Sequence, residues 1–307
     1  MPRPFRFGLI IDSRTATRDG VVALARRAEQ AGIAVLLGTD HLGRWATLPL
    51  LQAAAEATSL RIGTFVLNND LRHPTVLAQE LATIDAITDG RLEIGIGAGW
   101  NRDEYVAAGL PFDPAAQRVT RMQATVAMLK QALGEGRIDH EADAAYPAIH
   151  QEALPKAVQS PHPPIMVGGG GPRVLRYAAG HADIVGIDPR SLPGGGADPT
   201  DITEASVERK IGWIREAAGD RWAQLEVNIA LFEVDPAYRT RSGPPPPRAR
   251  GIGEAEMPAS PHYLVGEPSE MVETLLERRE RLGISYIALR PEHLDSIPKV
   301  IGRLAGR

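Results

Sequence analysis

The feature that most constrains the fold of this 307-residue chain is a regular alternation of short apolar runs with segments of helical periodicity. The apolar runs, interpreted as strands, are residues 5–11, 33–37, 61–67, 91–97, 164–168, 182–187, 225–233 and 284–289. The segments interpreted as helices are residues 19–31, 48–58, 75–88, 114–133, 172–180, 203–218, 268–282 and 294–304. The runs are continuously apolar, which is typical of parallel strands buried on both faces. Eight such units predict a closed (β/α)8 TIM barrel, with a doubly wound sheet as the alternative.

Three long connections interrupt this alternation, and the chain, residues 1–307, is otherwise expected to form a single barrel domain. One, at about 134–163, precedes the fifth strand, and the others, at about 188–201 and 235–261, follow the sixth and seventh strands. The last contains four successive prolines at 244–247, which predicts polyproline II structure or disorder. Because active sites of barrels form at the carboxyl ends of strands, the latter two connections are either lids or surface insertions.

Composition excludes several classes of function. The chain carries 34 basic and 38 acidic side chains, and this net charge of −4 gives no attraction to nucleic acid or anionic lipid. It has no cysteine, so disulfides, thiolate metal sites and cysteine nucleophiles are excluded, and a cytoplasmic location is expected. No apolar run is long enough for a transmembrane helix, and we expect no signal peptide. The eight histidines lack metal-binding spacing and no lysine ends a predicted strand, which disfavours metal and Schiff-base chemistry.

A glycine-rich turn follows the fifth predicted strand and leads into a helix that begins at Pro172. Glycine lets backbone N–H groups approach an anion closely, and the positive end of the helix dipole points to the same place. Gly169, Gly170 and Gly171 are therefore candidates for a phosphate site. A tight turn that needs glycine only for its backbone geometry is the alternative.

Polar and aromatic residues also follow the second predicted strand. His41, next to Asp40, is a candidate to donate a proton to a bound ring or to orient it, and a structural histidine is the alternative. Trp45 lies four residues further on and either walls a pocket or belongs to the core.

The segment after the fourth predicted strand, residues 97–105, is rich in groups that stack or form hydrogen bonds. Trp100 follows a glycine there, which suggests a platform for a flat ring. Asp103 and Glu104 contribute either to this site or to the cap of the next helical turn.

Five stretches of the sequence carry more specific information. The longest is GIGAGWNRDEYVAAGLPF at 95–112. The others are TDHL at 39–42, IGTFVLNNDLRHP at 62–74, IMVGGGGP at 165–172 and YLVGEPSEMVETL at 263–275. Taken in their order along the chain, the five stretches resemble the bacterial luciferase-like superfamily of barrels. Within that superfamily they resemble the branch that uses the deazaflavin coenzyme F420. The resemblance covers essentially the whole chain.

The resemblance implies a flavin-like tricycle at the carboxyl-terminal mouth of the barrel. Asp40 and His41 would lie beside the ring, and Asn68 would bond its edge. A non-prolyl cis peptide would join Phe65 to Val66 behind the ring. The residues that would line the ring and its side chain, or receive the phosphate, are Ala98, Gly99, Trp100, Asp103, Gly169, Gly170 and Gly171.

The resemblance also implies a homodimer that packs through the early helices. The apolar stretch 48–57 is compatible with that, although helices of the same chain would cover it equally well. The sugar-phosphate dehydrogenases of the superfamily share the arrangement seen here as Asp40, His41 and Trp45. They place a glutamate proton donor where this sequence has Trp100, so the sequence argues against sugar-phosphate oxidation.

Three functions follow from these observations. The first is an F420-dependent oxidoreductase that transfers a hydride between the deazaflavin and a small organic substrate, reducing a C=C, C=N or C=O bond. His41, or a water near Asp40, would supply the proton. The second is a luciferase-like monooxygenase that uses reduced FMN on the same scaffold, and the glycine-rich fourth loop favours F420 over it. The third is a barrel that binds a flavin without turnover.

Overall fold

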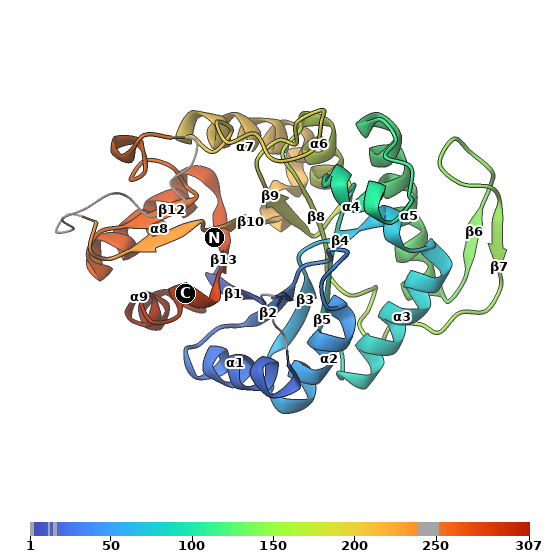
Figure 1. The fold of residues 1–307 in the computed structure, drawn as a ribbon, viewed down its shortest axis with the longest axis horizontal. Coiled ribbons are helices and arrows are strands. Elements are labelled where there is room, and N and C mark those ends of the chain that lie inside the picture. Colours follow the sequence, from blue (N-terminus) through green and yellow to red (C-terminus); the bar gives the residue numbers. More distant parts are fainter. Residues whose placement is uncertain (1–2, 12, 15–16, 239–251) are drawn as a thin grey trace.

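The computed structural model describes residues 3–11, 13–14, 17–238 and 252–307, and its main sheet closes into a barrel (Figure 1). The barrel strands are β1 (Arg6–Ile11), β2 (Val35–Gly38), β3 (Arg61–Thr64), β4 (Leu67–Asn68), β5 (Leu92–Gly97), β8 (Ile165–Gly169), β9 (Ile184–Ile187), β10 (Glu226–Ala230) and β13 (Ile284–Leu289). Their order is β3-β2-β1-β13-β10-β9-β8-β5-β4, all pairings are parallel, and β3 also pairs with β5, which closes the ring. Since β3 and β4 are two parts of one strand, the described residues confirm the predicted eight-stranded barrel.

Helices follow the strands and cover the outside of the barrel (Figure 1). They are α1 (Arg18–Gln30), α2 (Thr47–Ala57), α3 (Pro74–Ile87), α5 (Ala115–Glu135), α6 (Pro172–His181), α7 (Glu204–Ala218), α8 (Pro268–Leu282) and α9 (Pro298–Leu304). Each lies within a few residues of a predicted helix. The short helix α4 (Arg102–Ala107) was not predicted as an element of its own. It places Asp103 and Glu104 in its first turn.

Local sequence signals fix the ends of several helices. The hydroxyl of Thr17 accepts a hydrogen bond from the backbone N–H of Gly20 and so caps the amino end of α1. The same helix stops before Gly32, whose φ of +81° is costly for any residue with a Cβ atom. A glycine with a φ of +80°, Gly136, ends α5 in the same way.

The barrel interior and the layer between barrel and helices form two separate groups of buried apolar side chains. Leu37, Met166 and Tyr286 belong to the inner group. Leu36, Val167 and Ile287, one residue along the same strands, belong to the outer group. This alternation explains why the strands read as continuous apolar runs, because both of their faces are buried.

Charged side chains close the amino-terminal end of the barrel. The guanidinium of Arg6 donates hydrogen bonds to Glu93 at 2.6 Å and to Glu226 at 2.5 Å, and Arg61 donates to Glu93 at 2.8 Å. The Arg6 guanidinium also lies 4.4 Å from the centre of the Tyr286 ring. These bonds tie the strands together at the amino-terminal end, whereas barrel architecture predicts ligands at the carboxyl-terminal end.

Two of the long connections contain strands that the sequence did not predict. The segment before β8 forms an antiparallel hairpin of β6 (Ile138–His140) and β7 (Ile149–Gln151), which protrudes beside α3 and α5 (Figure 1). The strand predicted at 225–233 ends at Ala230, and β11 (Glu233–Asp235) instead pairs in parallel with β12 (Tyr263–Val265). The prolines at 244–247, predicted to form polyproline II or disorder, lie outside the described residues.

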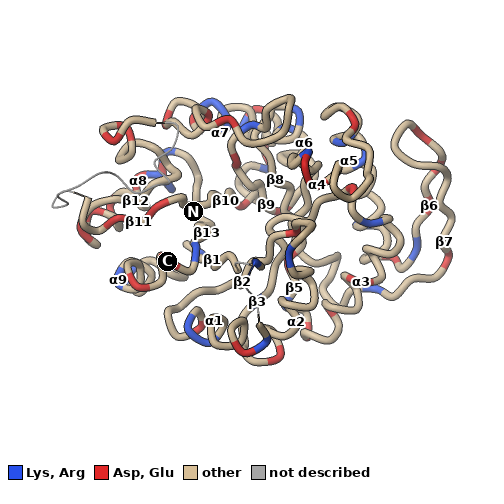
Figure 2. The backbone as a smooth tube through the Cα atoms, in the orientation of Figure 1, with Lys and Arg blue, Asp and Glu red and all other residues tan. Residues whose placement is uncertain are grey.

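Basic and acidic side chains are interspersed along the chain, in keeping with its small net charge (Figure 2). Among the described helices, none combines the length and the apolar character that crossing a membrane requires.

Candidate active site

A cavity of about 500 Å3 lies at the carboxyl-terminal ends of the barrel strands. It brings together most of the residues predicted from the sequence, namely Asp40, His41, Phe65, Val66, Asn68, Ala98, Gly99, Trp100, Gly169, Gly170 and Gly171. Two predicted residues do not line it. Trp45 is 60% exposed just before α2, and Asp103 is exposed in the first turn of α4. The cavity therefore has the position and the residues of a candidate active site.

His41 is paired with an acid that the sequence analysis did not single out. Its Nδ1 lies 2.7 Å from Oε1 of Glu104, and Asn101 donates to the same oxygen at 2.6 Å. Since a carboxylate only accepts hydrogen bonds, Nδ1 of His41 carries a proton and Nε2 is left for a ligand. The Trp100 ring stands edge-on to the imidazole, with ring centres 6.0 Å apart. The only signal for Glu104 was the 95–112 stretch, where it was indistinguishable from a helix cap.

Asp40 is held by a cation and a backbone N–H group. Its two oxygens accept hydrogen bonds from Arg72 at 2.7 and 3.1 Å, and Oδ2 also accepts from the backbone N–H of Asn68 at 3.1 Å. The side chain is buried, so the guanidinium is its main source of charge compensation. This arrangement favours a positioning role for Asp40, which fixes the start of β4 against the end of β2.

The orientation of the Asn68 amide is fixed by its oxygen. Oδ1 accepts from the backbone N–H of Asp70 at 3.1 Å. The hydroxyl of Tyr105 lies 2.9 Å from this oxygen and 3.0 Å from Oδ2 of Asp70, and its single proton is shared between these two acceptors. Burial and the charge of Asp70 raise the pKa of the Tyr105 phenol, which therefore stays protonated and acts as a donor. Because the oxygen is occupied, the NH2 group of Asn68 is left to donate to a ligand in the cavity.

Phe65 and Val66 form the back wall of the cavity. The peptide bond between them is cis, as the family resemblance implies. The Val66 side chain packs against Gly97, where an added Cβ would lie only 2.8 Å from Cγ2 of the valine. It packs against Gly168 as well, so the glycines of β5 and β8 make room for this wall.

The glycine-rich turn after β8 lies at the amino-terminal end of α6. Gly171 caps this helix without a side-chain hydrogen bond, so the first N–H groups of the helix have no capping side chain. Among the described residues, Arg173 in the first turn bonds only to neutral groups of α5: the carbonyl of Ala116 and the side chains of Thr120 and Gln123. Its charge is therefore not neutralised by a carboxylate, and together with the helix dipole it makes this corner attractive to an anion.

Two further polar side chains line the cavity from the adjacent strands β9 and β10. Asn228 donates to the carbonyl of Tyr286 at 3.2 Å, while its Oδ1 is buried without a hydrogen-bond partner among the described residues. Asp188 follows β9, and desolvation by the surrounding protein raises the pKa of its carboxyl to about 6, even though its side chain is accessible to water within the cavity. The nearby charges of Lys210 and Arg290 act against this shift. Sequence analysis had no signal for Asn228.

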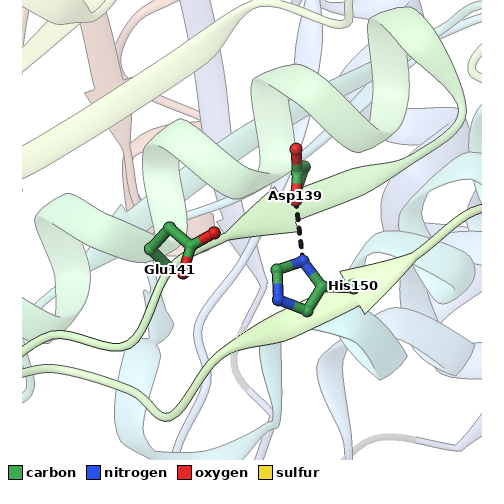
Figure 3. A group of neighbouring side chains, drawn as sticks. All are labelled: Asp139, Glu141 and His150. Carbon is green, nitrogen blue, oxygen red and sulfur yellow. Dashed lines mark hydrogen bonds and ion pairs between the residues drawn. The ribbon is translucent and has the colours of Figure 1, made fainter.

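Metal-ligating side chains gather elsewhere. Within the described part of the chain, one group of three lies close enough to share an ion: Asp139, Glu141 and His150, on the β6–β7 hairpin. Figure 3 shows His150 bonded to Asp139, with a distance of 2.7 Å between Nδ1 and Oδ1. All three are exposed, and none lines the cavity.

Comparison with known proteins identifies relatives of the chain. The family model for luciferase-like monooxygenases matches residues 4–209. An F420-dependent glucose-6-phosphate dehydrogenase from Kineococcus radiotolerans is 29% identical over 191 residues, which cover 59% of this chain and 56% of the relative. A protein of the same description from Intrasporangium calvum is 32% identical over 169 residues, covering 51% of this chain and 50% of the relative. The chain thus spans about half the length of the curated relatives it matches.

Solved structures share the fold over nearly the whole chain. The coenzyme F420-dependent tetrahydromethanopterin reductase from Methanopyrus kandleri superimposes with a TM-score of 0.76 over 98% of both chains, at 18% identity. An F420-dependent secondary alcohol dehydrogenase in complex with an F420-acetone adduct gives 0.73, also at 18% identity, over 97% of this chain and 98% of that one. At these identities the likeness shows the barrel fold.

Proposed function

The chain belongs to the luciferase-like monooxygenase family, and on this premise we propose that it is an oxidoreductase dependent on coenzyme F420. It would transfer a hydride between the deazaflavin and a small organic substrate. One observation carries the proposal: a single cavity joins a histidine–glutamate pair at one side to a glycine turn with an uncompensated arginine at the other. The relatives named for F420 support the choice of cofactor.

The residues of the cavity fit such a group. A deazaflavin presents N–H and carbonyl groups along one edge of a flat ring, and a phosphate on its side chain. Oδ1 of Asn228 lacks a donor, and the NH2 group of Asn68 lacks an acceptor among the described residues, so both would bond that edge. The phosphate would be held by backbone N–H groups at Gly170 and Gly171 and by the guanidinium of Arg173.

The protein contributes a proton and a fixed geometry to the reaction. When bound, the deazaflavin supplies a hydride from carbon and accepts one in the reverse direction. The Nδ1–H group of His41 donates a hydrogen bond to Glu104, so the ring is held with Nε2 toward the cavity. A proton at Nε2 passes to the substrate heteroatom as the hydride arrives, and the carboxylate of Glu104 balances the charge of the imidazolium. The ring of Trp100 contacts this imidazole edge-on.

A side-by-side titration with oxidised F420 and FMN tests the cofactor. We expect F420 to bind with a micromolar dissociation constant, seen as fluorescence quenching, and to raise the melting temperature more than FMN does. Tighter binding of FMN favours the rival function, a monooxygenase that uses reduced FMN. If neither cofactor binds, the proposal fails.

Two variants of α6 sharpen this titration. Arg173→Ala removes the uncompensated charge at the glycine turn, and we expect it to weaken F420 binding about tenfold or more. Arg176→Ala, one turn further along, is the control, because Arg176 pairs with Glu216 on the surface and does not line the cavity. Equal affinities of the two variants would place the phosphate elsewhere.

A homodimer and a cytoplasmic location complete the proposal. The predicted dimer stretch in α2 buries Leu48 and Leu51 within its own chain, whereas α3 leaves Val76 and Ile87 more than half exposed. Such exposed apolar side chains are what a second copy would cover. Sedimentation velocity measures the mass, and a monomer at micromolar concentration would count against the dimer.

A further inference from the structure

Asp188 is a polar residue of the cavity that the proposed reaction does not yet use. It is the first residue after β9, and its backbone is fixed on two sides: its N–H donates to the carbonyl of Gly169 at 3.1 Å, and its carbonyl accepts from Nζ of Lys210 at 3.0 Å. Along β9, Ile184 and Gly186 face the barrel interior. Since side chains alternate along a strand, Asp188 continues this inward-facing set, above the barrel rather than out toward the helices.

The carboxyl of Asp188 differs from the other two acids of the cavity. Asp40 accepts hydrogen bonds from Arg72, and Glu104 accepts them from His41 and Asn101. No described residue donates a hydrogen bond to the carboxyl of Asp188, although it lines the cavity and is accessible to water. Of the three acids in the described cavity wall, Asp188 is therefore the one whose carboxyl oxygens are available to bind a ligand.

The cations near Asp188 are engaged with other groups. Nζ of Lys210 lies 2.8 Å from Oδ2 of Asp201, and Arg190 bonds to Asp198 at 2.5 Å. Lys210 and Arg290 still lower the pKa of the Asp188 carboxyl, and Asp201 raises it, but desolvation outweighs them and brings it to about 6. A ligand that displaces water from the cavity adds to this desolvation, so the neutral acid is favoured in the occupied site.

We propose that Asp188 contacts the substrate and donates a hydrogen bond to an uncharged oxygen on it, so that the site takes neutral carbonyl or hydroxyl compounds and disfavours anionic ones. A protonated carboxyl is a donor, whereas its ionised form repels a carboxylate or phosphate placed beside it. Two cations of the cavity wall, Arg118 and Arg173, have no carboxylate partner among the described residues. Arg173 lies at the glycine turn assigned to the cofactor phosphate, and Arg118 is buried and donates to the carbonyls of Ala98 and Gly99. This inference rests on the proposed function.

A pair of probes of nearly equal shape tests it. Acetophenone and benzoate differ mainly in charge, and their dissociation constants for the F420-loaded protein are measured by ligand-observed NMR at pH 5.2 and pH 8. We expect acetophenone to bind better than benzoate at pH 8. We also expect benzoate to weaken about tenfold between the two pH values, because Asp188 ionises between them.

Two variants separate Asp188 from general charge effects. Asp188→Asn keeps the shape and a donor but cannot ionise, so the dependence of benzoate affinity on pH should become clearly smaller, and the affinity at pH 8 should rise toward that of acetophenone. Asp220→Asn removes one exposed carboxylate on the 3-10 helix Gly219–Gln224 and should behave like the unmodified protein. The inference is overturned if benzoate binds as well as acetophenone at pH 8, if neither probe binds, or if Asp188→Asn leaves the pH dependence in place. The F420 titration reports on the proposed function independently, so the two failures are distinguishable.

Discussion

Gly170 is a residue of the candidate site at which a single added methyl group is expected to force the backbone to move. A Cβ atom at this position would lie 2.5 Å from the backbone N of Arg190 and 2.5 Å from the carbonyl carbon of Pro189, and it would also contact the carbonyl oxygen of Asp188. Real Cβ atoms do not approach backbone atoms this closely. Gly170→Ala therefore forces the segment after β9 to move away from the turn after β8.

The size of the effect follows from how firmly that segment is held. Overpacking costs about 1–3 kcal/mol, and we expect the upper end because bonds from Gly169 and Lys210 fix the backbone of Asp188 on both sides. An unfolding entropy of about 2.1 cal/mol/K per residue corresponds to about 0.6 kcal/mol/K for a chain of this length. A loss of about 3 kcal/mol therefore lowers the melting temperature by about 5 °C.

The neighbouring glycine provides the matched control. A Cβ at Gly171 would meet nothing within 4 Å, and its φ of −92° is open to any residue. Gly171→Ala should therefore change the free energy of unfolding by less than about 1 kcal/mol, since the gain in chain stiffness offsets a slightly poorer helix cap. The assay is urea unfolding of both variants, followed by circular dichroism. If Gly170→Ala unfolds at the same urea concentration as Gly171→Ala, the steric reasoning is refuted.

Three further predictions concern other parts of the molecule. Glu104→Gln should lose the fixed tautomer of His41, which 15N NMR of the imidazole reports as a mixture of Nδ1–H and Nε2–H forms; an unchanged spectrum would contradict the role of the pair. Arg72→Leu leaves Asp40 buried without its cation and should destabilise the fold by about 3–5 kcal/mol in urea unfolding, and a second change, Asp40→Leu, should recover much of the loss. Burial lowers the pKa of His262 from its usual 6.5 to about 4. Between these two pH values the unfolded chain binds a proton at this histidine and the folded protein does not, so the free energy of unfolding falls by about 3 kcal/mol as the pH drops from 6.5 to 4. His262→Asn should flatten the decline of unfolding free energy over this pH range.

The barrel was predictable because its signal is repeated and local. Each strand is buried on both faces, so each reads as an apolar run, and each is followed by a segment with a helical stripe. The hairpin strands β6 and β7 lack this signal, because each has three residues with only one buried among them, Ile138. Their pairing depends on contacts between residues 9 to 13 positions apart, such as Ile138 with Gln151, which periodicity does not report.

The location of the site was also predictable, whereas the direction of individual side chains was not. Residues that follow different parallel strands meet at one end of a barrel, so strand ends were sufficient to find most of the cavity wall. Within the helix α4, successive side chains are about 100° apart. Asp103 is therefore exposed, while Glu104 reaches His41 across 63 positions of sequence. Asp103 was among the site residues predicted from the sequence, and Glu104 was not.

The three acids of the cavity show why partners, rather than residue types, decide roles. Asp40 accepts hydrogen bonds from a guanidinium, and Glu104 accepts one from an imidazole and orients it. Asp188 has cations within electrostatic range, but Lys210 is already bonded to Asp201, so its carboxyl remains free for a ligand. Each pairing joins segments brought together only by the closed barrel or by the loop after β9. The fold therefore determines which acid of the site is paired with a cationic or donor side chain. Asp188, which has no such partner among the described residues, is the acid placed to discriminate between substrates by charge.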